Sequence, residues 1–162
     1  VYYASIDIDI IKVKNMTVEL VAGGLAVDDR GELQFCNDFD FMKEGVRRFY
    51  TVSNHSASFV RAWHAHKNES KCVVVLSGAA IVGSVKIDDW ASPSKDLPVE
   101  RFVLTAQQPK MLKIPAGYAN GFKTLLADTK LIFFSNKTLE ECKDDDYRYE
   151  AHYWEPWDIV ER

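Results

Sequence analysis

The chain has 162 residues, of which 47% are hydrophobic and 27% are charged, and its formal net charge is −4. This composition excludes a disordered or low-complexity chain. The 20 basic and 24 acidic residues are nearly balanced, so the sequence shows no electrostatic footprint for nucleic acid. The length suits one compact domain, which we expect to span residues 1–162.

The cysteines and the apolar segments indicate in which cellular compartment the protein is expected. The three cysteines, Cys36, Cys72 and Cys142, form no CxxC pair and lack the spacing of a small disulfide scaffold. No charged segment followed by an apolar one opens the chain, so nothing indicates secretion. The longest apolar runs, such as 131–134, are too short to span a bilayer. We therefore expect a cytoplasmic protein with no membrane partner.

Short segments in which apolar and polar residues alternate dominate the chain, and a period of two is typical of strands with one buried face. The first is Ile6 to Val13, in which isoleucines alternate with aspartates. Further strands are predicted over 18–21, 33–35, 46–52, 59–66, 73–76, 80–87, 99–105, 111–114 and 131–134. Turn residues such as Gly23-Gly24 and Pro115-Ala116-Gly117 separate them.

Helical signals are confined to two short stretches, 39–44 and 138–144, and Thr138 and Glu141 have the spacing of a capping box. Many short strands with almost no helix predict an all-β sandwich or barrel. Residues 1–24 are expected to form N-terminal strands and are a candidate for exchange between two copies. The aromatic-rich residues 138–162 are expected to form a tail packed on the barrel, or the rim of a ligand site.

The most informative segment is 54–71, with the sequence NHSASFVRAWHAHKNESK. In a strand over 59–66, alternation places His64 and His66 on one face and Arg61 on the other. The two histidines would then project into the interior of a rolled sheet, which can hold one small ligand.

Lys71 opens the next predicted strand and can reach the same interior space. Arg61, His64 and Lys71 together favour a ligand that is anionic or bears a carbonyl group. The plainer interpretation is a pair of hydrogen-bonded histidines near a rim, with a lysine that extends its ammonium group to solvent.

A metal site is a competing interpretation, because two histidines one residue apart on a barrel strand are a plausible ligand pair. However, Glu69 falls on a predicted turn, and Asn120 stands where another histidine could enter after Pro115-Ala116-Gly117. Asparagine is a poor ligand for transition metals, so we predict no metal.

Four blocks of the chain, in order, resemble motifs of the dTDP-4-dehydrorhamnose 3,5-epimerase family of cupin-fold nucleotide-sugar epimerases. They are VDDRGEL at 27–33, NHS with VRAWH between 54 and 64, Lys71 with VVV, SG and VKID between 71 and 88, and IPAGYANGF at 114–122. The resemblance implies a single cupin jelly roll. It also implies epimerisation at C3, C5 or both of a nucleoside-diphosphate 4-keto-6-deoxy sugar in deoxysugar and polysaccharide biosynthesis. The enzyme would be a homodimer that uses no cofactor.

The same resemblance implies roles for single residues. His64 corresponds to the general base that removes the proton next to the keto group, and Lys71 to the residue that stabilises the enolate oxygen. Arg61 and Arg30 correspond to residues that hold the sugar and diphosphate, with Arg30 reaching across the dimer interface. These roles agree with general chemistry, because a histidine base has a pKa near the operating pH and an enolate needs a fixed cationic partner.

The chain departs from the family at two positions. Asn120 stands where the family has a second histidine, and Phe133 where it has the tyrosine that acts as the acid on the opposite sugar face. No matched block contains the acid that orients the base, for which Glu150 and Asp158 are candidates. Two tyrosines, Tyr50 and Tyr118, are candidates for contacts with the nucleotide base, although packing in the core or at the rim is the plainer interpretation of each.

A second resemblance leaves the reaction open. His64-Ala65-His66-Lys67, preceded by Arg48-Phe49-Tyr50, is similar to the dTDP-sugar 3,4-ketoisomerases, whose histidine pair shuttles a proton between C3 and C4. In that reaction His66 would be catalytic together with His64. The changes at Phe133 and Asn120 also motivate a third hypothesis, a cupin that binds a nucleotide sugar without turnover.

Overall fold

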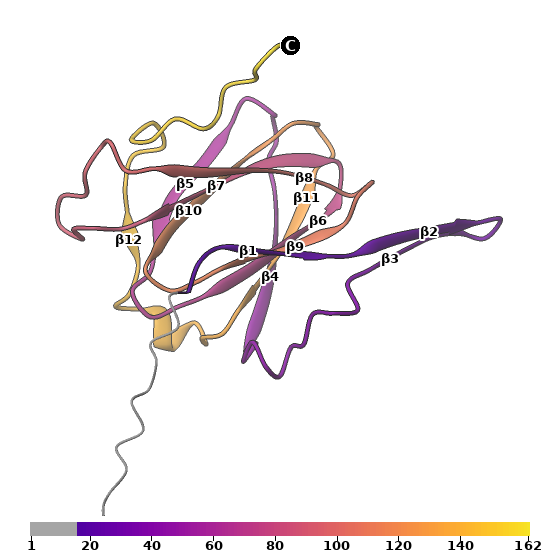
Figure 1. Cartoon of the computed structure of the whole chain (residues 1–162), viewed down its shortest axis with the longest axis horizontal. Coiled ribbons are helices and arrows are strands. Elements are labelled where there is room, and N and C mark those ends of the chain that lie inside the picture. The colour runs from indigo at the N-terminus through magenta and orange to yellow at the C-terminus, as the bar shows by residue number, and fades with distance from the viewer. Residues whose placement is uncertain (1–15) are drawn as a thin grey trace, which may run out of the picture.

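The computed structural model describes residues 16–162, so the predicted strand from Ile6 to Val13 lies outside the described residues. Over 16–162 the chain consists of β-strands and one short 3₁₀ helix, η1 (Glu140–Cys142) (Figure 1). Within this range no helix is long and apolar enough to cross a membrane.

The strands alternate with short turns along the whole described chain. They are β1 (Glu19–Ala22), β2 (Gly24–Asp28), β3 (Gly31–Phe35), β4 (Arg48–Ser53), β5 (Val60–Ala65), β6 (Lys71–Ser77), β7 (Ala79–Lys86), β8 (Val99–Thr105), β9 (Lys110–Ile114), β10 (Tyr118–Thr124), β11 (Lys130–Ser135) and β12 (Tyr147–Arg148).

Two five-stranded antiparallel sheets form the body. Their strand orders are β1-β9-β6-β11-β4 and β12-β5-β10-β7-β8, and β2 and β3 form a separate two-stranded sheet. Figure 1 shows the two larger sheets facing one another across a common interior. The predicted all-β fold is therefore confirmed.

Alternation along the strands divides each sheet into an inner and an outer face. On β6, Val73 and Val75 belong to the main core cluster between the sheets, while Cys72 and Val74 join a smaller cluster on the outer face. Burial of such a side chain contributes roughly 1.5–3 kcal/mol. Since alternation has a period of two, Lys71 shares the inward face with Val73 and Val75.

Strands β4 and β11 pair antiparallel, and their side chains also alternate between the inner and outer faces of the sheet. Leu131 and Phe133 of β11 point into the core, and Phe133 lies directly opposite Tyr50 of β4. Arg48, Tyr50 and Val52 are half-buried on the inward face of β4, whereas Phe49 between them is exposed. The cationic and phenolic groups of β4 therefore face the interior.

Two strands of the second sheet, β10 and β12, were not predicted from the sequence. The β10 sequence, YANGFKT, contains residues of low strand propensity, yet β10 pairs with both β5 and β7. This double pairing overrides local propensity. β12 pairs with β5 but is only two residues long, and a strand of two residues is too short to give a sequence pattern.

The helical signal at 138–144 corresponds to η1, and its predicted capping box is confirmed. The backbone N–H of Thr138 donates to Glu141 Oε2 at 2.7 Å, and the N–H of Glu141 donates to Thr138 Oγ1 at 3.3 Å. The turn leads the chain from β11 to β12.

The chain after β12 packs on the outer face of the second sheet. Trp63 of β5 lies 5.4 Å from Trp154 and 5.0 Å from Trp157, measured between ring centroids, and all three are buried. This aromatic cluster covers the back of β5 and fixes the strand that carries His64.

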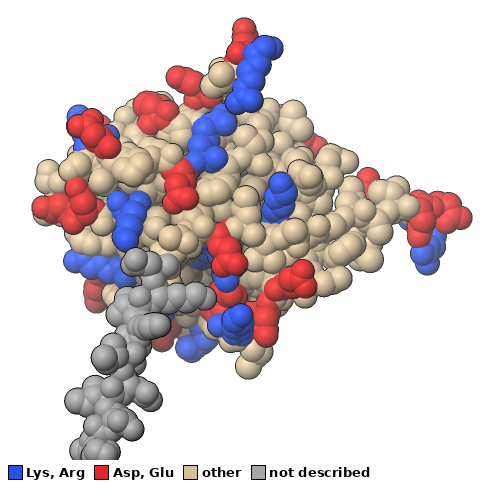
Figure 2. All heavy atoms as spheres, viewed as in Figure 1, with Lys and Arg blue, Asp and Glu red and all other residues tan. Residues whose placement is uncertain are grey.

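The β2–β3 hairpin projects away from the two sheets (Figure 1). Arg30 occupies its tip, where its side chain is 86% exposed and paired with Asp28. Figure 2 shows acidic and basic side chains together at this tip. Within one chain, Arg30 is therefore separated from the interior between the sheets.

Candidate active site

A β-bulge in β5 decides which side chains face the interior. His64 pairs with Asn120 of β10, but Arg61 pairs with Phe122, so three steps on β5 match two on β10. The extra residue is accommodated beside Gly121, whose missing Cβ would otherwise lie 2.3 Å from the Cβ of Ala62. Arg61 and His64 consequently share the inward side, and the prediction from simple alternation that they lie on opposite faces is wrong.

The first cavity lies between the sheets at this bulge and has a volume of about 200 Å³. Its polar lining combines His64 and Arg61 of β5, Asn120 of β10 and Lys71 of β6. Tyr50, Val52, Phe122 and Phe133 provide the remaining wall. The structure thus brings together six residues predicted from the sequence: Tyr50, Arg61, His64, Lys71, Asn120 and Phe133.

A second cavity of about 320 Å³ adjoins the first and shares Tyr50, His64 and Lys71 with it. His66 lines only this second cavity. Its other lining residues are mostly charged or polar: Arg48, Glu69, Leu139, Cys142, Lys143, Asp146 and Arg148. The two cavities therefore form one site with His64 and Lys71 at their junction.

His64 is half-buried and has an acidic partner. Its Nδ1 lies 3.9 Å from Asp146 Oδ1, and Asp146 also pairs with Arg148 at 2.9 Å. Burial lowers the pKa of His64, Lys71 and Arg148 lower it further, and Asp146 opposes them. The ring is therefore neutral near pH 7, with Nδ1 toward the carboxylate and Nε2 on the other side.

Removal of the Asp146 charge should change the titration of His64 in a defined direction. Because Asp146 raises the pKa of His64, we expect Asp146→Asn to lower it, so that the ring stays neutral to a more acidic pH. An NMR titration of the histidine ring signals in wild type and variant measures this shift. An unchanged or raised pKa of His64 would contradict the assignment, and Asp144→Asn, an exposed neighbour, serves as the control.

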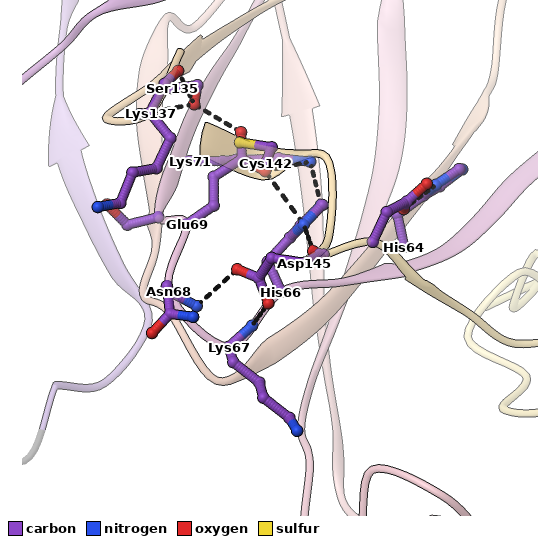
Figure 3. A network of polar contacts seen from close by, with 12 residues as sticks. His64, His66, Lys67, Asn68, Glu69, Lys71, Ser135, Lys137, Cys142 and Asp145 are labelled. Carbon is purple, nitrogen blue, oxygen red and sulfur yellow. Dashed lines mark hydrogen bonds and ion pairs between the residues drawn. The ribbon is translucent and has the colours of Figure 1, made fainter. Parts of the chain in front are cut away.

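Lys71 is held in a buried network of charges (Figure 3). Its Nζ donates to His66 Nε2 at 2.8 Å and lies 3.6 Å from Glu69 Oε2. Glu69 Oε1 in turn accepts from Arg48 Nη2 at 2.8 Å and from Ser135 Oγ at 2.5 Å. Burial lowers the pKa of Lys71 and the Glu69 carboxylate opposes that effect, so the ammonium form depends on Glu69.

Two further contacts fix polar groups at the rim of the first cavity. Asn120 Nδ2 donates to the carbonyl oxygen of His64 at 3.1 Å, which ties β10 to β5 beside the imidazole. Arg61 Nε donates to Asn54 Oδ1 at 3.1 Å, and within residues 16–162 its outer guanidinium nitrogens have no hydrogen-bond partner.

Two predicted site residues are not brought to these cavities. Tyr118 is buried in the main core cluster and lines neither cavity. Arg30 lies at the tip of the projecting hairpin, as described above. Glu150 and Asp158, considered as partners of the base, are both exposed, and the acid beside His64 is Asp146.

Sequence reasoning did not place three acidic residues of this region beside the histidines: Glu69, Asp145 and Asp146. Asp145 is buried, and its carboxylate accepts from the backbone N–H groups of Lys67 and Asn68 at 2.7 and 2.8 Å. The acidic run 144–146 resembles a solvated loop in sequence, and only the pairing of β12 with β5 places it against the histidines. No local pattern marks Glu69 as buried.

Among residues 16–162, no group of three or more His, Cys, Asp or Glu side chains has an arrangement that could hold a metal ion. The nitrogen atoms of His66 face Lys71 and the carbonyl oxygen of Asp145. The polar groups of the site are suited to acid–base chemistry and to binding an anionic or carbonyl oxygen.

Comparison with known proteins identifies the family. The family model described as FdtA, WxcM-like, C-terminal matches residues 11–155. The chain belongs to this family. No curated protein sequence matches the chain.

Solved structures of nucleotide-sugar enzymes share the fold. The dTDP-4-dehydrorhamnose 3,5-epimerase of Bacillus anthracis is 21% identical with a TM-score of 0.68, over 89% of this chain and 86% of that one. A 3,4-ketoisomerase from Helicobacter canadensis is 15% identical with a TM-score of 0.64, over 85% and 95%. The 3′-monoepimerase ChmJ of Streptomyces bikiniensis is 17% identical with a TM-score of 0.64, over 81% and 68%. These likenesses confirm the predicted cupin-like fold.

Proposed function

We propose that this member of the FdtA, WxcM-like family is an isomerase of a nucleoside-diphosphate 4-keto-6-deoxy sugar, and that it epimerises C3, C5 or both. The observation that carries the proposal is the junction of the two cavities. There an imidazole from one sheet meets an ammonium and a phenol from the other, since His64, Lys71 and Tyr50 line both cavities. The structural similarity to dTDP-sugar epimerases and ketoisomerases supports this substrate class.

In the first step, neutral His64 takes the proton from the carbon next to the ketone. The C–H electron pair moves into the carbon–carbon bond, and the carbonyl electrons move onto the oxygen to give an enolate. Asp146 lies near Nδ1 and stabilises the imidazolium that forms. Lys71 offers an N–H to the enolate oxygen, and a fixed donor of this kind contributes about 3–4 kcal/mol to the transition state.

Epimerisation also requires a proton from the opposite face of the sugar. Phe133 cannot supply it, but its cross-strand neighbour Tyr50 stacks on it with ring planes 5° apart and centroids 5.2 Å apart. Burial raises the pKa of Tyr50, and Glu69 adds to this effect, so the phenol stays protonated. We propose that Tyr50 donates the proton, one strand away from the position where the epimerase family has its tyrosine.

Tyr50→Phe tests this assignment. If Tyr50 is the acid, the variant should still exchange the substrate proton with solvent, because His64 is intact, but inverted product should fall by about 10²-fold or more. Deuterium incorporation and product configuration, both read by NMR, separate the two steps. Formation of inverted product at the wild-type rate would contradict the role of Tyr50. Tyr153→Phe, on the outer face, is the matched control.

The second candidate is 3,4-ketoisomerisation of the same substrate class, which the apolar side chain of Phe133 favours. A proton that leaves C3 and returns to C4 can stay on one sugar face, while the hydroxyl proton at C3 passes to the oxygen at C4, so no opposite acid is needed. In that case Tyr50→Phe would leave the product yield nearly unchanged, and the product would carry its keto group at C3.

The other residues predicted to bind substrate would contact the diphosphate part of the molecule. We propose that Arg61, whose guanidinium lines the first cavity, binds the diphosphate, because its planar fork matches phosphate oxygens. Arg30 can contribute only if the hairpin of one copy lies beside the cavity of another. Val27 and Leu33 on that hairpin are 66% and 63% exposed, which supports a homodimer in which they become buried.

Incubation of the protein in deuterated water with 4-keto-6-deoxy sugars carried by dTDP, UDP, GDP and CDP tests the proposal. Deuterium at C3 or C5 with an inverted centre supports the epimerase, and deuterium at C4 with a displaced keto group supports the ketoisomerase. Tight binding without exchange of any sugar would show a binding protein instead and would overturn the proposal.

A further inference from the structure

His66 resembles the second base of a histidine pair in sequence, but both of its ring nitrogens are already engaged. Nδ1 contacts the carbonyl oxygen of Asp145 (Figure 3). A carbonyl oxygen only accepts, so Nδ1 carries the hydrogen. In the neutral ring Nε2 is then the acceptor, and it faces Lys71 Nζ at 2.8 Å.

The neutral form of His66 is the stable one at this place. The residue is only 6% exposed. Burial lowers its pKa, the neighbouring Lys71 lowers it further, and the Glu69 carboxylate opposes these effects without reversing them. A second positive charge on the ring would face the ammonium of Lys71 directly. His66 consequently has no free lone pair for a substrate proton unless the contact with Lys71 breaks.

The Lys71 ammonium has three donors and a restricted set of partners. One N–H goes to His66, and a second lies toward Glu69 Oε2 at 3.6 Å. The third is available to the cavities that Lys71 lines. The imidazole and the carboxylate thus fix the direction of the donor that would meet an enolate oxygen.

Glu69 is anchored so that it cannot leave this arrangement. Its side chain has no exposed surface, and its Oε1 is held by Arg48 and Ser135. Its Oε2 has no hydrogen-bond partner within residues 16–162, although it lies 3.1 Å from His66 Nδ1, whose hydrogen is directed to the Asp145 carbonyl. A buried carboxylate oxygen of this kind stabilises the nearby ammonium electrostatically.

We propose that His66 is a positioning residue: it accepts a hydrogen bond from Lys71 and, together with Glu69, aims the ammonium at the developing oxyanion. His66 is therefore not a second catalytic base. This inference rests on the proposed function for its catalytic consequence, while the hydrogen bond itself can be tested without any substrate.

The substrate-free test is the tautomer of His66 in the full chain labelled with ¹⁵N-histidine. Long-range ¹H–¹⁵N correlations should show a neutral ring at pH 7 with hydrogen on Nδ1 and none on Nε2. A hydrogen on Nε2, or an imidazolium at pH 7, would overturn the proposal. This result is independent of whether any sugar is turned over, so a failure of the proposed function remains distinguishable.

The catalytic test compares His66→Gln with His66→Leu. The glutamine amide oxygen can replace Nε2 as an acceptor but cannot act as a base, so His66→Gln should retain exchange within a few-fold of wild type. His66→Leu removes the acceptor and should lower kcat by about 10- to 100-fold, with little change in KM. His152→Gln, an exposed histidine on the C-terminal segment, is the matched control.

The pH profile gives a readout that a purely structural role would not move. The groups that face Lys71 are Arg48 on β4, His64 on β5, His66 and Glu69 before β6, Cys142 in η1 and Asp146 before β12. Activity needs the ammonium form, which is lost as the pH rises through the pKa of Lys71. Removal of its acceptor lowers that pKa, so the alkaline limb of His66→Leu should move to lower pH.

In His66→Gln the alkaline limb should stay where it is in wild type. Equal losses in both variants with an unshifted alkaline limb would identify His66 as a second base and overturn the proposal. If His66→Leu does not fold, the glutamine variant and the tautomer still decide the matter.

Discussion

We expect His64→Asn to exchange the substrate proton about 10²- to 10⁴-fold more slowly than wild type, the range that a general base contributes. Asparagine keeps a polar side chain in the cavity but cannot take up a proton near neutral pH. Exchange of deuterium into the 4-keto sugar, followed by NMR over time, measures the effect on the chemical step alone.

His55→Asn is the matched control for this prediction. His55 is exposed in the bend before β5, so its replacement should leave exchange unchanged. Exchange in His64→Asn at more than one-tenth of the wild-type rate, with the fold intact by circular dichroism, would contradict the role of His64 as base.

The second large effect is expected from Lys71→Met, which removes the ammonium but keeps a side chain of similar length. Loss of one fixed oxyanion donor lowers kcat by about 10²- to 10³-fold. We expect KM to change much less, because the enolate charge exists only after substrate has bound. Steady-state kinetics on the preferred sugar nucleotide separates the two constants.

Lys130→Met is the control for this variant, because Lys130 is exposed at the start of β11. Glu69 keeps Arg48 and Ser135 as partners in Lys71→Met, so we expect the protein to fold, which a thermal melt verifies. A rise in KM with an unchanged kcat would instead assign Lys71 to substrate binding.

Some inward residues of the site could be predicted because strand alternation is strict where one face is buried. Lys71 has the same parity as Val73 and Val75, and Tyr50 faces the cross-strand position of Phe133. These placements follow from a period of two and from the apolar pattern on either side. The strand ends were also predicted well where glycine and proline turns mark them.

Features that depend on tertiary pairing could not be predicted. The bulge that turns Arg61 inward arises because β5 is held against β10 at Gly121, and no local sequence pattern indicates an extra residue. Asp146 reaches His64 only through the two-residue strand β12. The sequence around Glu69 is that of a polar turn. The burial of Glu69 results from contacts with Arg48 and Ser135, which are distant along the chain.

The role of His66 shows the same limit. A histidine pair one residue apart is equally compatible with a metal site, a proton shuttle and a hydrogen-bonded support. The structure favours the hydrogen-bonded support, because β5 ends at Ala65 and His66 there contacts Lys71 and the Asp145 carbonyl. His66, two residues after the proposed base His64, is thus a hydrogen-bond partner of Lys71, the proposed oxyanion donor.

The most direct measurement is a crystal structure of His64→Asn with a bound 4-keto-6-deoxy sugar nucleotide. The sugar should occupy the junction of the two cavities with its keto oxygen within hydrogen-bond distance of Lys71 Nζ, and C3 or C5 about 3–3.5 Å from the side chain at position 64. A sugar bound outside the two sheets, or a keto oxygen directed away from Lys71, would contradict the convergence of base and ammonium on one carbonyl group.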